Sequence, residues 1–414
     1  MFAAFVVARS PVLPAAMPQI TMYDPHAPEH AHGIYVSELL SAFREVEHEI
    51  TVNLLGTREW GTAEAANTLR CTLYPAIPVA RARAEYANVI VWVFARLVRP
   101  AALEWQIIRH ALKHPEIAAI HYQLPQGLCT ALSRYVFQRL RKQRLLTVHN
   151  IEPHDLRPRW FRAARTIVNR AVLRSFDALI VHSEKLGADL AAYLGRHSPP
   201  VFIACHGTGS PDVDGSPSLE TRLRERSILF LGAARPNKGL HVLLKAMTEL
   251  PGFTLTLAGY RGYDRYRERV VQPLLETARK NGSHISVLSG FLDKDRVRQL
   301  LLSHSLVALP YTQFSSDSGI LHLAIAYGIP VVVTDVGALP EAVTTFGIGV
   351  VVPPGEPSAF AAGIRRLYTL EAADIEEGFS KAKRTLSWTQ AALQTASIYK
   401  AILSNTDSIH ADDD

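Results

Sequence analysis

The sequence predicts an α/β protein made of two doubly wound, Rossmann-like domains that face a central cleft. The chain has 414 residues and is 48% hydrophobic, which is more than one core normally organises. In both halves, short apolar runs rich in β-branched residues alternate with helical patterns, as is typical of parallel sheets covered by helices. Residues 206–226 interrupt this alternation with a Gly-, Ser-, Pro- and Asp-rich stretch, which indicates a linker.

The first half contains six apolar runs that we expect to be strands. The opening run is followed by a glycine-containing loop and a helix at Ile34–Arg44, a βα unit typical of such sheets. A longer helical pattern covers Arg81–His114, with Pro100 as the expected break. The predicted strands are Gln19–Tyr23, Glu49–Leu55, Ile117–Tyr122, Leu145–His149, Ala178–His182 and Val201–Ala204.

The second half restarts the pattern with ILFLG at 228–232 and a helix after Gly239. Further strands are predicted at Phe253–Ala258, Ile285–Leu288, Leu306–Leu309, Pro330–Thr334 and Gly349–Val352. These elements divide the chain into an extension at 1–18, a first domain at 19–205, the linker, a second domain at 227–375, final helices at 376–405 and a frayed tail at 406–414. The first segment lacks the basic start of a signal peptide, and we expect either an unstructured extension or a translation start at Met17.

Composition narrows the classes of function. Cys71, Cys129 and Cys205 are far apart and form no CxxC pair, so we expect no disulfide or thiolate zinc site, and a reducing cytoplasm. No apolar run reaches the roughly 18 residues of a membrane span. The formal charge is +6, but residues 134–174 hold eleven Lys and Arg against two acids. This basic segment indicates either a solvated helix face or a surface that meets anionic lipid or a polyanionic acceptor; no nucleic-acid module accompanies it.

A loop of small residues between two buried strands is the best candidate for phosphate binding. YTQFSSDSG follows the run at 306–309 and precedes the short helix ILHLAIAYG, which stops at Gly328. The first turn of a helix leaves backbone N–H groups without internal acceptors, and the helix dipole favours an anion there. We therefore expect the backbone of Ser316, Asp317, Ser318, Gly319 and Ile320 to face a phosphate.

A second loop carries two cations. In GAARPNKG, Arg235 and Lys238 lie between Gly232 and Gly239, directly after a predicted strand. Two fixed positive charges at the ligand edge of a sheet suit a diphosphate, because they offset the charge that develops as it leaves. An exposed pair of basic residues would look the same, and the second phosphate-type loop in this domain favours the functional interpretation.

Residues 228–343 resemble the carboxyl-terminal domain of GT-B glycosyltransferases of family 4, the retaining enzymes that use nucleotide sugars. The resemblance is carried by ILFLG with the following KG, and by GIPVVVTDVGALPEAV from Gly328. It extends more weakly to LTVHN at 146–150, DALIVHS at 177–183 and HG at 206–207. SWTQAALQTASIYKAIL is similar to the final helices that cross back to the first domain in this family.

The resemblance implies sugar transfer from a nucleoside diphosphate to a glycan or lipid-linked glycan acceptor, with retention of configuration. It implies no cofactor beyond the nucleotide-sugar co-substrate and no bound metal. Arg235 and Lys238 would hold the diphosphate, and His149 would face the donor sugar. A strand-end histidine at a cleft can also donate to a sugar hydroxyl on chemical grounds, although a structural histidine is the alternative. Gly33, in the first βα loop, would let the backbone approach the donor.

The chain departs from the family pattern at several positions. Ala233 stands where many relatives have an arginine, and Ser315 and Leu323 occupy the positions of a glutamate pair that contacts sugar and ribose. Asp317 could replace one glutamate, but a helix N-cap is an equal alternative. A degenerate subunit that binds a nucleotide sugar without transfer, or a nucleotide-sugar epimerase, therefore stay open beside the transferase.

Other residues have weaker signals. His26, His30 and His32 share one loop, where an acceptor-lining role is favoured over zinc because acidic or thiolate partners are lacking at suitable spacing. We expect Glu341 to act as a helix cap. The resulting hypothesis is a cytoplasmic transferase, with peripheral contact at the inner face of a membrane through its basic segment as the alternative to a solvated helix face.

Overall fold

We describe the fold from a computed structural model, which covers residues 17–26, 31–56, 60, 89–151, 159–211, 217–260, 264–290 and 292–411. Outside these ranges lie residues 1–16 of the expected extension at 1–18, His30, Cys71, and the parts of the linker and tail at 212–216 and 412–414. Within them, Cys129 and Cys205 are free thiols. No helix in the described ranges has the length and hydropathy of a bilayer span.

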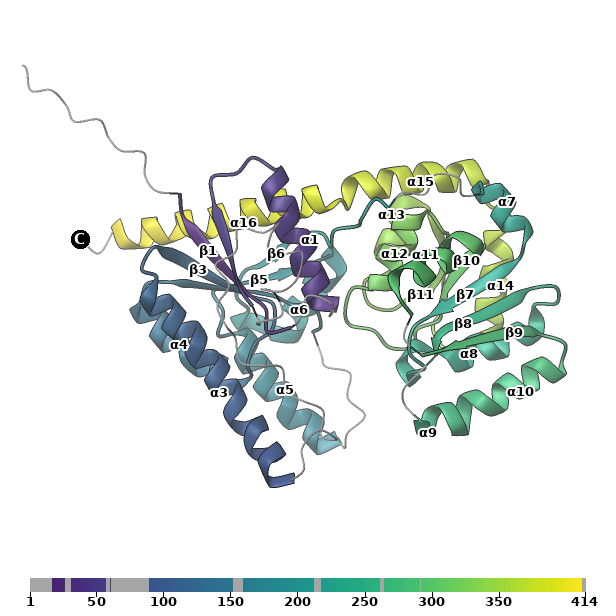
Figure 1. Cartoon of the computed structure of the whole chain (residues 1–414), viewed down its shortest axis with the longest axis horizontal. Helices are drawn as coiled ribbons and strands as arrows, with labels where there is room; N and C mark the ends of the chain where they lie inside the picture. The colour runs from purple at the N-terminus through teal and green to yellow at the C-terminus, as the bar shows by residue number, and fades with distance from the viewer. Residues whose placement is uncertain are drawn as a thin grey trace, which may run out of the picture.

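The first sheet has six parallel strands in the order β2-β1-β3-β4-β5-β6 (Figure 1). The reversal of strand order beside β1 is the doubly wound arrangement, which places a ligand crevice at the carboxyl edge. The strands are short, and β1, β3, β4 and β5 are almost fully buried because helices cover both faces, whereas the edge strands β2 and β6 are only partly buried. The strands are β1 Gln19–Tyr23, β2 Thr51–Leu55, β3 Ile117–Tyr122, β4 Gln143–Thr147, β5 Ala178–Val181 and β6 Val201–Ile203.

Two groups of helices cover this sheet. On one face, α1 (Ala31–Glu45) and the last helix, α16 (Trp388–Ala411), pack against Ile20, Leu145 and Ile180. On the other face, Ile107, Phe137 and other side chains pack against neighbouring strands. These belong to α3 Val89–Lys113, α4 Leu128–Arg139, α5 Arg159–Leu173 and α6 Glu184–Leu194, which is followed by η3 Gly195–His197.

Pro100 does not break the helical pattern as expected, because it lies inside α3. A proline inside a helix costs about 3 kcal/mol through the lost hydrogen bond and the ring clash. Ile107 and Ala111, one to three turns further on, are buried in the first-domain core. Their packing offsets the local cost, which the sequence pattern around Pro100 does not reveal.

The second sheet also has six parallel strands, in the order β12-β11-β10-β7-β8-β9. They are β7 Ser227–Leu231, β8 Thr254–Tyr260, β9 His284–Ser289, β10 Leu306–Leu309, β11 Val331–Thr334 and β12 Gly349–Val352. One face packs against α8 Leu240–Ala246, α10 Gln272–Lys280 and α14 Pro357–Leu367. The other packs against α11 Lys294–Ser303, α12 Gly319–Tyr327, α13 Leu339–Phe346 and α15 Ala372–Thr385. Short turns complete the domain at η4 Pro236–Lys238, η5 Met247–Glu249, α9 Asp264–Tyr266 and η6 Arg267–Val271.

The segment expected to be an irregular linker contains a helix, α7 (Leu219–Arg224). Ser218 caps it by accepting a hydrogen bond from the backbone N–H of Thr221. Leu219 is buried in the second-domain core, and Arg222 donates to the carbonyl of Gly328. The α7 helix has only 6 residues, so it contains too few apolar positions to produce a helical pattern in the sequence.

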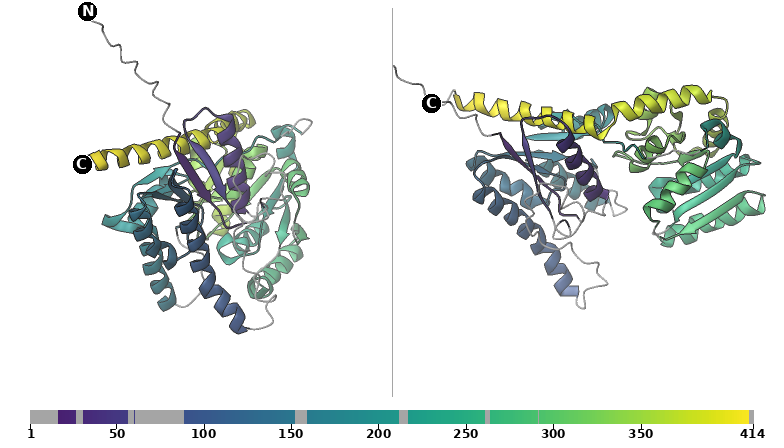
Figure 2. Two further views of the ribbon diagram at one scale, coloured as in Figure 1. Left: turned by 60° about the vertical axis from the view of Figure 1, so that its left-hand side comes forward. Right: turned by 45° about the horizontal axis from the view of Figure 1, so that its top comes forward.

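The chain returns to the first domain through α15 and α16, which run end to end along both domains (Figures 1 and 2). Tyr399 of α16 is buried and its hydroxyl bonds the imidazole of His121 on β3 over 2.7 Å. The backbone of α16 continues to Ala411, so helix replaces the tail expected from residue 406.

Candidate active site

The loop between β10 and α12 has the geometry expected of an anion site. Ser318, and not Asp317, is the N-cap of α12, because its hydroxyl accepts from the backbone N–H of Leu321. Gly319 and Ile320 form the first turn, where an α-helix offers their N–H groups no internal acceptor. The N–H of Ser318 donates to the Asp317 carboxylate over 2.8 Å, so it is already occupied. The first helical turn therefore leaves the N–H groups of Gly319 and Ile320 without an acceptor inside the helix.

The cationic loop lies beside this helix because β7 and β10 are neighbouring strands. The backbone N–H of Thr312 donates to the carbonyl of Asn237 over 2.9 Å. Gly239 has a φ of +66°, and a Cβ there would lie 1.7 Å from the carbonyl oxygen of Pro310. Only glycine meets both conditions. The two loops are thus fixed against each other at the carboxyl edge of the second sheet.

Lys238 and Arg235 differ in how the loop holds them. The Lys238 ammonium lies 4.1 Å from the ring centroid of Tyr311 and donates to its hydroxyl. A cation–π contact and a hydrogen bond restrict this long side chain, so its charge has a defined place. Arg235 is exposed and precedes η4. Gly232 has a φ of +128° and its N–H donates to Ala258 at the end of β8, which closes the turn after β7.

His149 lies just beyond β4 and meets the second domain. The next residue, Asn150, forms a β-bridge with Ser316, and the N–H of Ile151 donates to the carbonyl of Ser315. The His149 imidazole bonds Gln123 through Nε2 over 3.0 Å. The backbone directly after His149 therefore contacts the loop predicted to bind phosphate.

Burial and neighbouring imidazoles keep His149 neutral. Loss of hydration is the largest cause that lowers its pKa well below the ordinary value, and His32, His182 and His206 add to it. The His149 and His182 rings lie 5.3 Å apart, with 3.4 Å between Nδ1 and Nε2. A neutral imidazole can donate or accept a hydrogen bond, but it does not supply a fixed positive charge.

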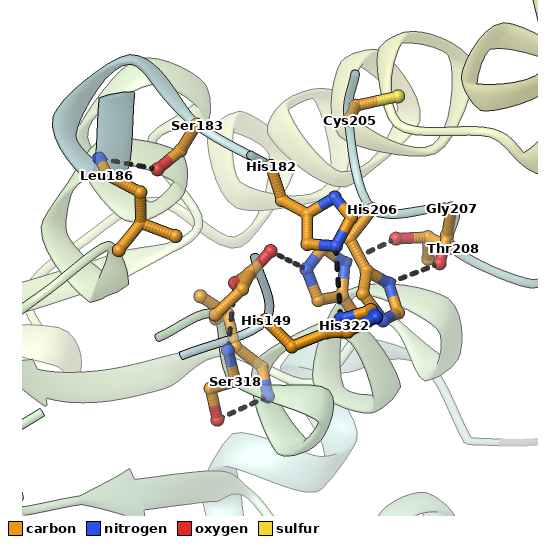
Figure 3. Close-up of polar contacts among 12 residues, drawn as sticks. His149, His182, Ser183, Leu186, Cys205, His206, Gly207, Thr208, Ser318 and His322 are labelled. Atoms are coloured by element: carbon orange, nitrogen blue, oxygen red, sulfur yellow. Dashed lines mark hydrogen bonds and ion pairs between the residues drawn. The ribbon is translucent and has the colours of Figure 1, made fainter. Parts of the chain in front are cut away.

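A cluster of histidines, of which His182 and His322 are buried and His149 and His206 are half-buried, crosses from the first domain to the second (Figure 3). The Nδ1–H of His182 donates to the carbonyl of Ala204, and its Nε2 lies 3.4 Å from Nδ1 of His149. His206 stacks on His322 of α12 at 4.2 Å between ring centroids. The His322 Nδ1 bonds the Thr208 hydroxyl over 2.9 Å. We call His149, His182, His206 and His322 the histidine cluster.

Asp317 is the negative partner of this cluster. Its carboxylate lies 2.8 Å from the Nε2 of His322, and both side chains are almost fully buried. Burial alone would raise the pKa of Asp317, but the ion pair and hydrogen bond with His322 outweigh it and hold the pKa well below its usual range. Of the two alternatives for Asp317, the N-cap is wrong, because Ser318 caps α12 and the Asp317 carboxylate bonds the imidazole of His322.

Most of the histidine cluster was not singled out from the sequence. His182 and His206 occur in segments that carry the family resemblance, and nothing in the local sequence distinguishes His322. His182 directly follows the buried strand β5, and His206 lies three residues beyond the end of β6. Carboxyl ends of parallel strands meet at one edge, so this position was the available clue.

The remaining candidates are distributed as follows. Gly33 is buried in the first turn of α1, and not in a loop as predicted, because α1 already begins at residue 31. His26 bonds Asp24 over 2.7 Å and stacks on His32, which contacts the ring of His149. In the described part of the chain, no group of three or more His, Cys, Asp or Glu side chains is arranged to hold a metal ion.

Glu341 is a cap, but across the domain boundary. Its carboxylate accepts from the backbone N–H groups of Glu184 and Lys185, the first two residues of α6. A carboxylate at a helix N-terminus is favoured by the dipole and by the unpaired N–H groups. The residue therefore links α13 of the second domain to α6 of the first.

The structure is similar to solved proteins of the GT-B fold. Anabaena HepE in complex with UDP superposes with a TM-score of 0.67 and 18% identity, over 93% of this chain and 100% of that one. Two six-stranded Rossmann-like sheets that face each other at their carboxyl edges define this class. The chain therefore has the GT-B fold.

Sequence comparisons assign the family. Residues 32–210 match "Glycosyltransferase Family 4" and residues 225–370 match "Glycosyl transferases group 1". An uncharacterized glycosyltransferase of Methanocaldococcus jannaschii is 31% identical over 54% of this chain and 59% of its own length. A GDP-mannose:glycolipid 4-beta-D-mannosyltransferase of Xanthomonas campestris is 28% identical over 55% and 59%. The chain belongs to the family 4 type of GT-B glycosyltransferases, and it spans about six-tenths of the length of these curated relatives.

Proposed function

We propose that this protein transfers a sugar from a nucleoside-diphosphate sugar to a glycan or lipid-linked glycan acceptor, with retention of anomeric configuration. The observation that carries the proposal is the pairing of two loops at the carboxyl edge of the second sheet. One loop presents Lys238 and Arg235, and the other presents the first turn of α12. Cations and unpaired N–H groups together suit a diphosphate.

The residues act by stabilising the leaving group. Arg235 and Lys238 offset the negative charge that develops on the diphosphate when the bond to the sugar breaks. The N–H groups of Gly319 and Ile320 add donors that need no reorganisation. The departing diphosphate then helps to deprotonate the incoming acceptor hydroxyl on the same face of the sugar, so no pair of catalytic carboxylates is required.

His149 has a positioning role toward the donor sugar in this proposal. Its neutral imidazole lies next to the backbone contact between Asn150 and Ser316. A neutral ring can donate to a sugar hydroxyl without attracting the diphosphate. The nucleotide in the HepE structures, UDP, and the glycolipid acceptor in the name of the Xanthomonas relative support the donor and acceptor classes proposed here.

The test is a turnover assay with a matched control. Purified protein is incubated with a panel of nucleotide sugars, with and without acceptor, and release of nucleoside diphosphate is measured. Lys238→Ala is expected to lower turnover by about 100- to 1,000-fold, the usual loss for one charge-stabilising donor. Lys245→Ala, on the exposed side of α8, serves as the control. Unchanged turnover of Lys238→Ala would show that the diphosphate site lies elsewhere.

A degenerate subunit that binds a nucleotide sugar without transfer is the second candidate. Ser315 and Leu323 replace the glutamate pair of many relatives, and Asp317 is held by His322. A thermal-shift screen names the nucleotide, since a ligand that binds the folded state raises its stability. Specific binding with no glycosylated product on any glycan or lipid acceptor would favour this candidate, whereas detection of product would eliminate it.

A further inference from the structure

Three neighbouring helices of the first domain expose large apolar side chains. The residues are Trp105 and Leu112 on α3, Leu128, Leu132 and Tyr135 on α4, and Ile167 on α5. Trp105 is 59% exposed, and Leu132, Tyr135 and Ile167 are each close to 70% exposed. We call these six residues with their three helices the α3–α5 face. Contiguous exposed apolar residues of this size mark an interaction site.

The spacing of these residues gives one outward stripe on each helix. Trp105 and Leu112 are seven residues apart, and Leu128, Leu132 and Tyr135 follow at intervals of four and three, which places each set on one side of its helix. The opposite sides pack on the sheet. The three helices lie next to one another in chain order, and α3 and α5 reach beyond the sheet (Figure 1). The stripes therefore lie on three adjacent helices that cover the same face of the sheet.

The charge of this surface has a single sign. The sequences of α3, α4 and α5 contain ten Lys and Arg but one acid, Glu104. Glu104 is 3% exposed and accepts hydrogen bonds from Tyr122, Thr130 and Ser133. Its charge is directed inward. In the described residues of these helices, no carboxylate reaches the outer side, while Arg109 is exposed there.

Some basic side chains of the segment at 134–174 lie in the protein interior and not on its surface. Arg144 is 1% exposed and bonds Thr130 and Ser175 in the interior. Arg134 and Arg174 donate to backbone carbonyls at the ends of α5 and α6. The segment at 134–174 is therefore partly structural, and the exposed cations and apolar groups are shared with α3, outside that segment.

We propose that the α3–α5 face binds an anionic lipid bilayer. Amphipathic helices bind bilayers by placing apolar side chains at the acyl boundary while Lys and Arg meet anionic headgroups. A second copy of the chain fits less well, because a two-fold contact would bring the same cationic surface together. The proposal extends the proposed function, since a protein held at a bilayer meets lipid-linked acceptors, but binding itself requires no turnover.

Co-sedimentation with vesicles tests the proposal. The intact protein is mixed at low salt with vesicles of phosphatidylcholine alone or with added phosphatidylglycerol. We expect binding only to the anionic vesicles, with weakening at high salt because the headgroup interaction is screened. Trp105→Ser with Leu132→Ser, and separately Arg109→Glu with Lys113→Glu, should each weaken apparent binding by about tenfold or more. Leu393→Ser, at an exposed apolar residue of α16, is the matched control and should bind like the parent.

Two results would overturn the proposal of lipid binding. The parent protein could stay in the supernatant at low salt, or the Trp105→Ser, Leu132→Ser variant could bind vesicles like the parent. If the parent is a dimer that the same substitutions convert to a monomer, and it does not bind vesicles, the face is an interface between copies. Nucleotide-sugar turnover is measured separately: vesicle binding without turnover would count against the proposed function and not against lipid binding.

Discussion

Acidification from pH 7 to pH 5 should destabilise this protein strongly. His121, His149 and His206 are neutral in the folded chain because burial, the largest cause, lowers the pKa of each; for His121 the pKa falls to about 3. In the unfolded chain, a histidine titrates near pH 6.5. Below that pH the unfolded state binds more protons than the folded state, so the free energy of unfolding falls as the pH falls.

The magnitude follows from the three groups. Each histidine that stays neutral when folded and titrates near pH 6.5 when unfolded removes about 2 kcal/mol between pH 7 and pH 5. Three give about 6 kcal/mol, or a fall of roughly 7 °C in Tm for a chain of 414 residues. Asp317 contributes little in this window. Its pKa is lowered in the folded state, so its contribution is lost only below the ordinary carboxyl pKa of about 4.

Thermal unfolding followed by circular dichroism at pH 7, 6 and 5 measures the effect. His121→Gln removes one titrating group and should make Tm less dependent on pH, by about 2 kcal/mol over the window. His284→Gln changes an exposed histidine on β9 and should leave the dependence as in the parent. A Tm that is constant within about 2 °C from pH 7 to pH 5 would refute the reasoning, as would an equal pH dependence of His121→Gln and the parent.

Three further predictions follow from single contacts. Gly239→Ala should lower stability by about 2 to 5 kcal/mol, from the positive φ and the clash with Pro310, and should abolish nucleotide binding; an unchanged urea midpoint would contradict the geometry. His322→Leu, which leaves Asp317 buried without its partner, should cost about 3 to 5 kcal/mol, and adding Asp317→Asn should restore part of it in a double-mutant cycle. Glu341→Gln should loosen the link between the domains by about 0.5 to 1 kcal/mol, seen as a larger radius of gyration in X-ray scattering, whereas an unchanged radius would rule out this link.

Strand positions were predictable because buried parallel strands are short, apolar and β-branched. Ile117–Tyr122, Leu306–Leu309 and Gly349–Val352 have the predicted bounds. The α7 helix and the course of α3 through Pro100 were not predictable, because packing on a core formed by distant segments stabilises both. A short stretch of sequence indicates only the conformation that this stretch prefers by itself, whereas α7 and α3 depend on contacts with residues far away in the chain.

The sequence by itself determined the two-sheet architecture, the family, and the two loops that carry Lys238 and Ser318, since each depends on residues close together in the chain. Only the tertiary structure decided how Asp317 is used. Its partner His322 contacts His206 and Thr208, which come from the other half of the chain. Burial lowers the pKa of His206, and the contact with His322 lowers the pKa of Asp317 against the effect of burial. Both effects arise only when the two domains pack together.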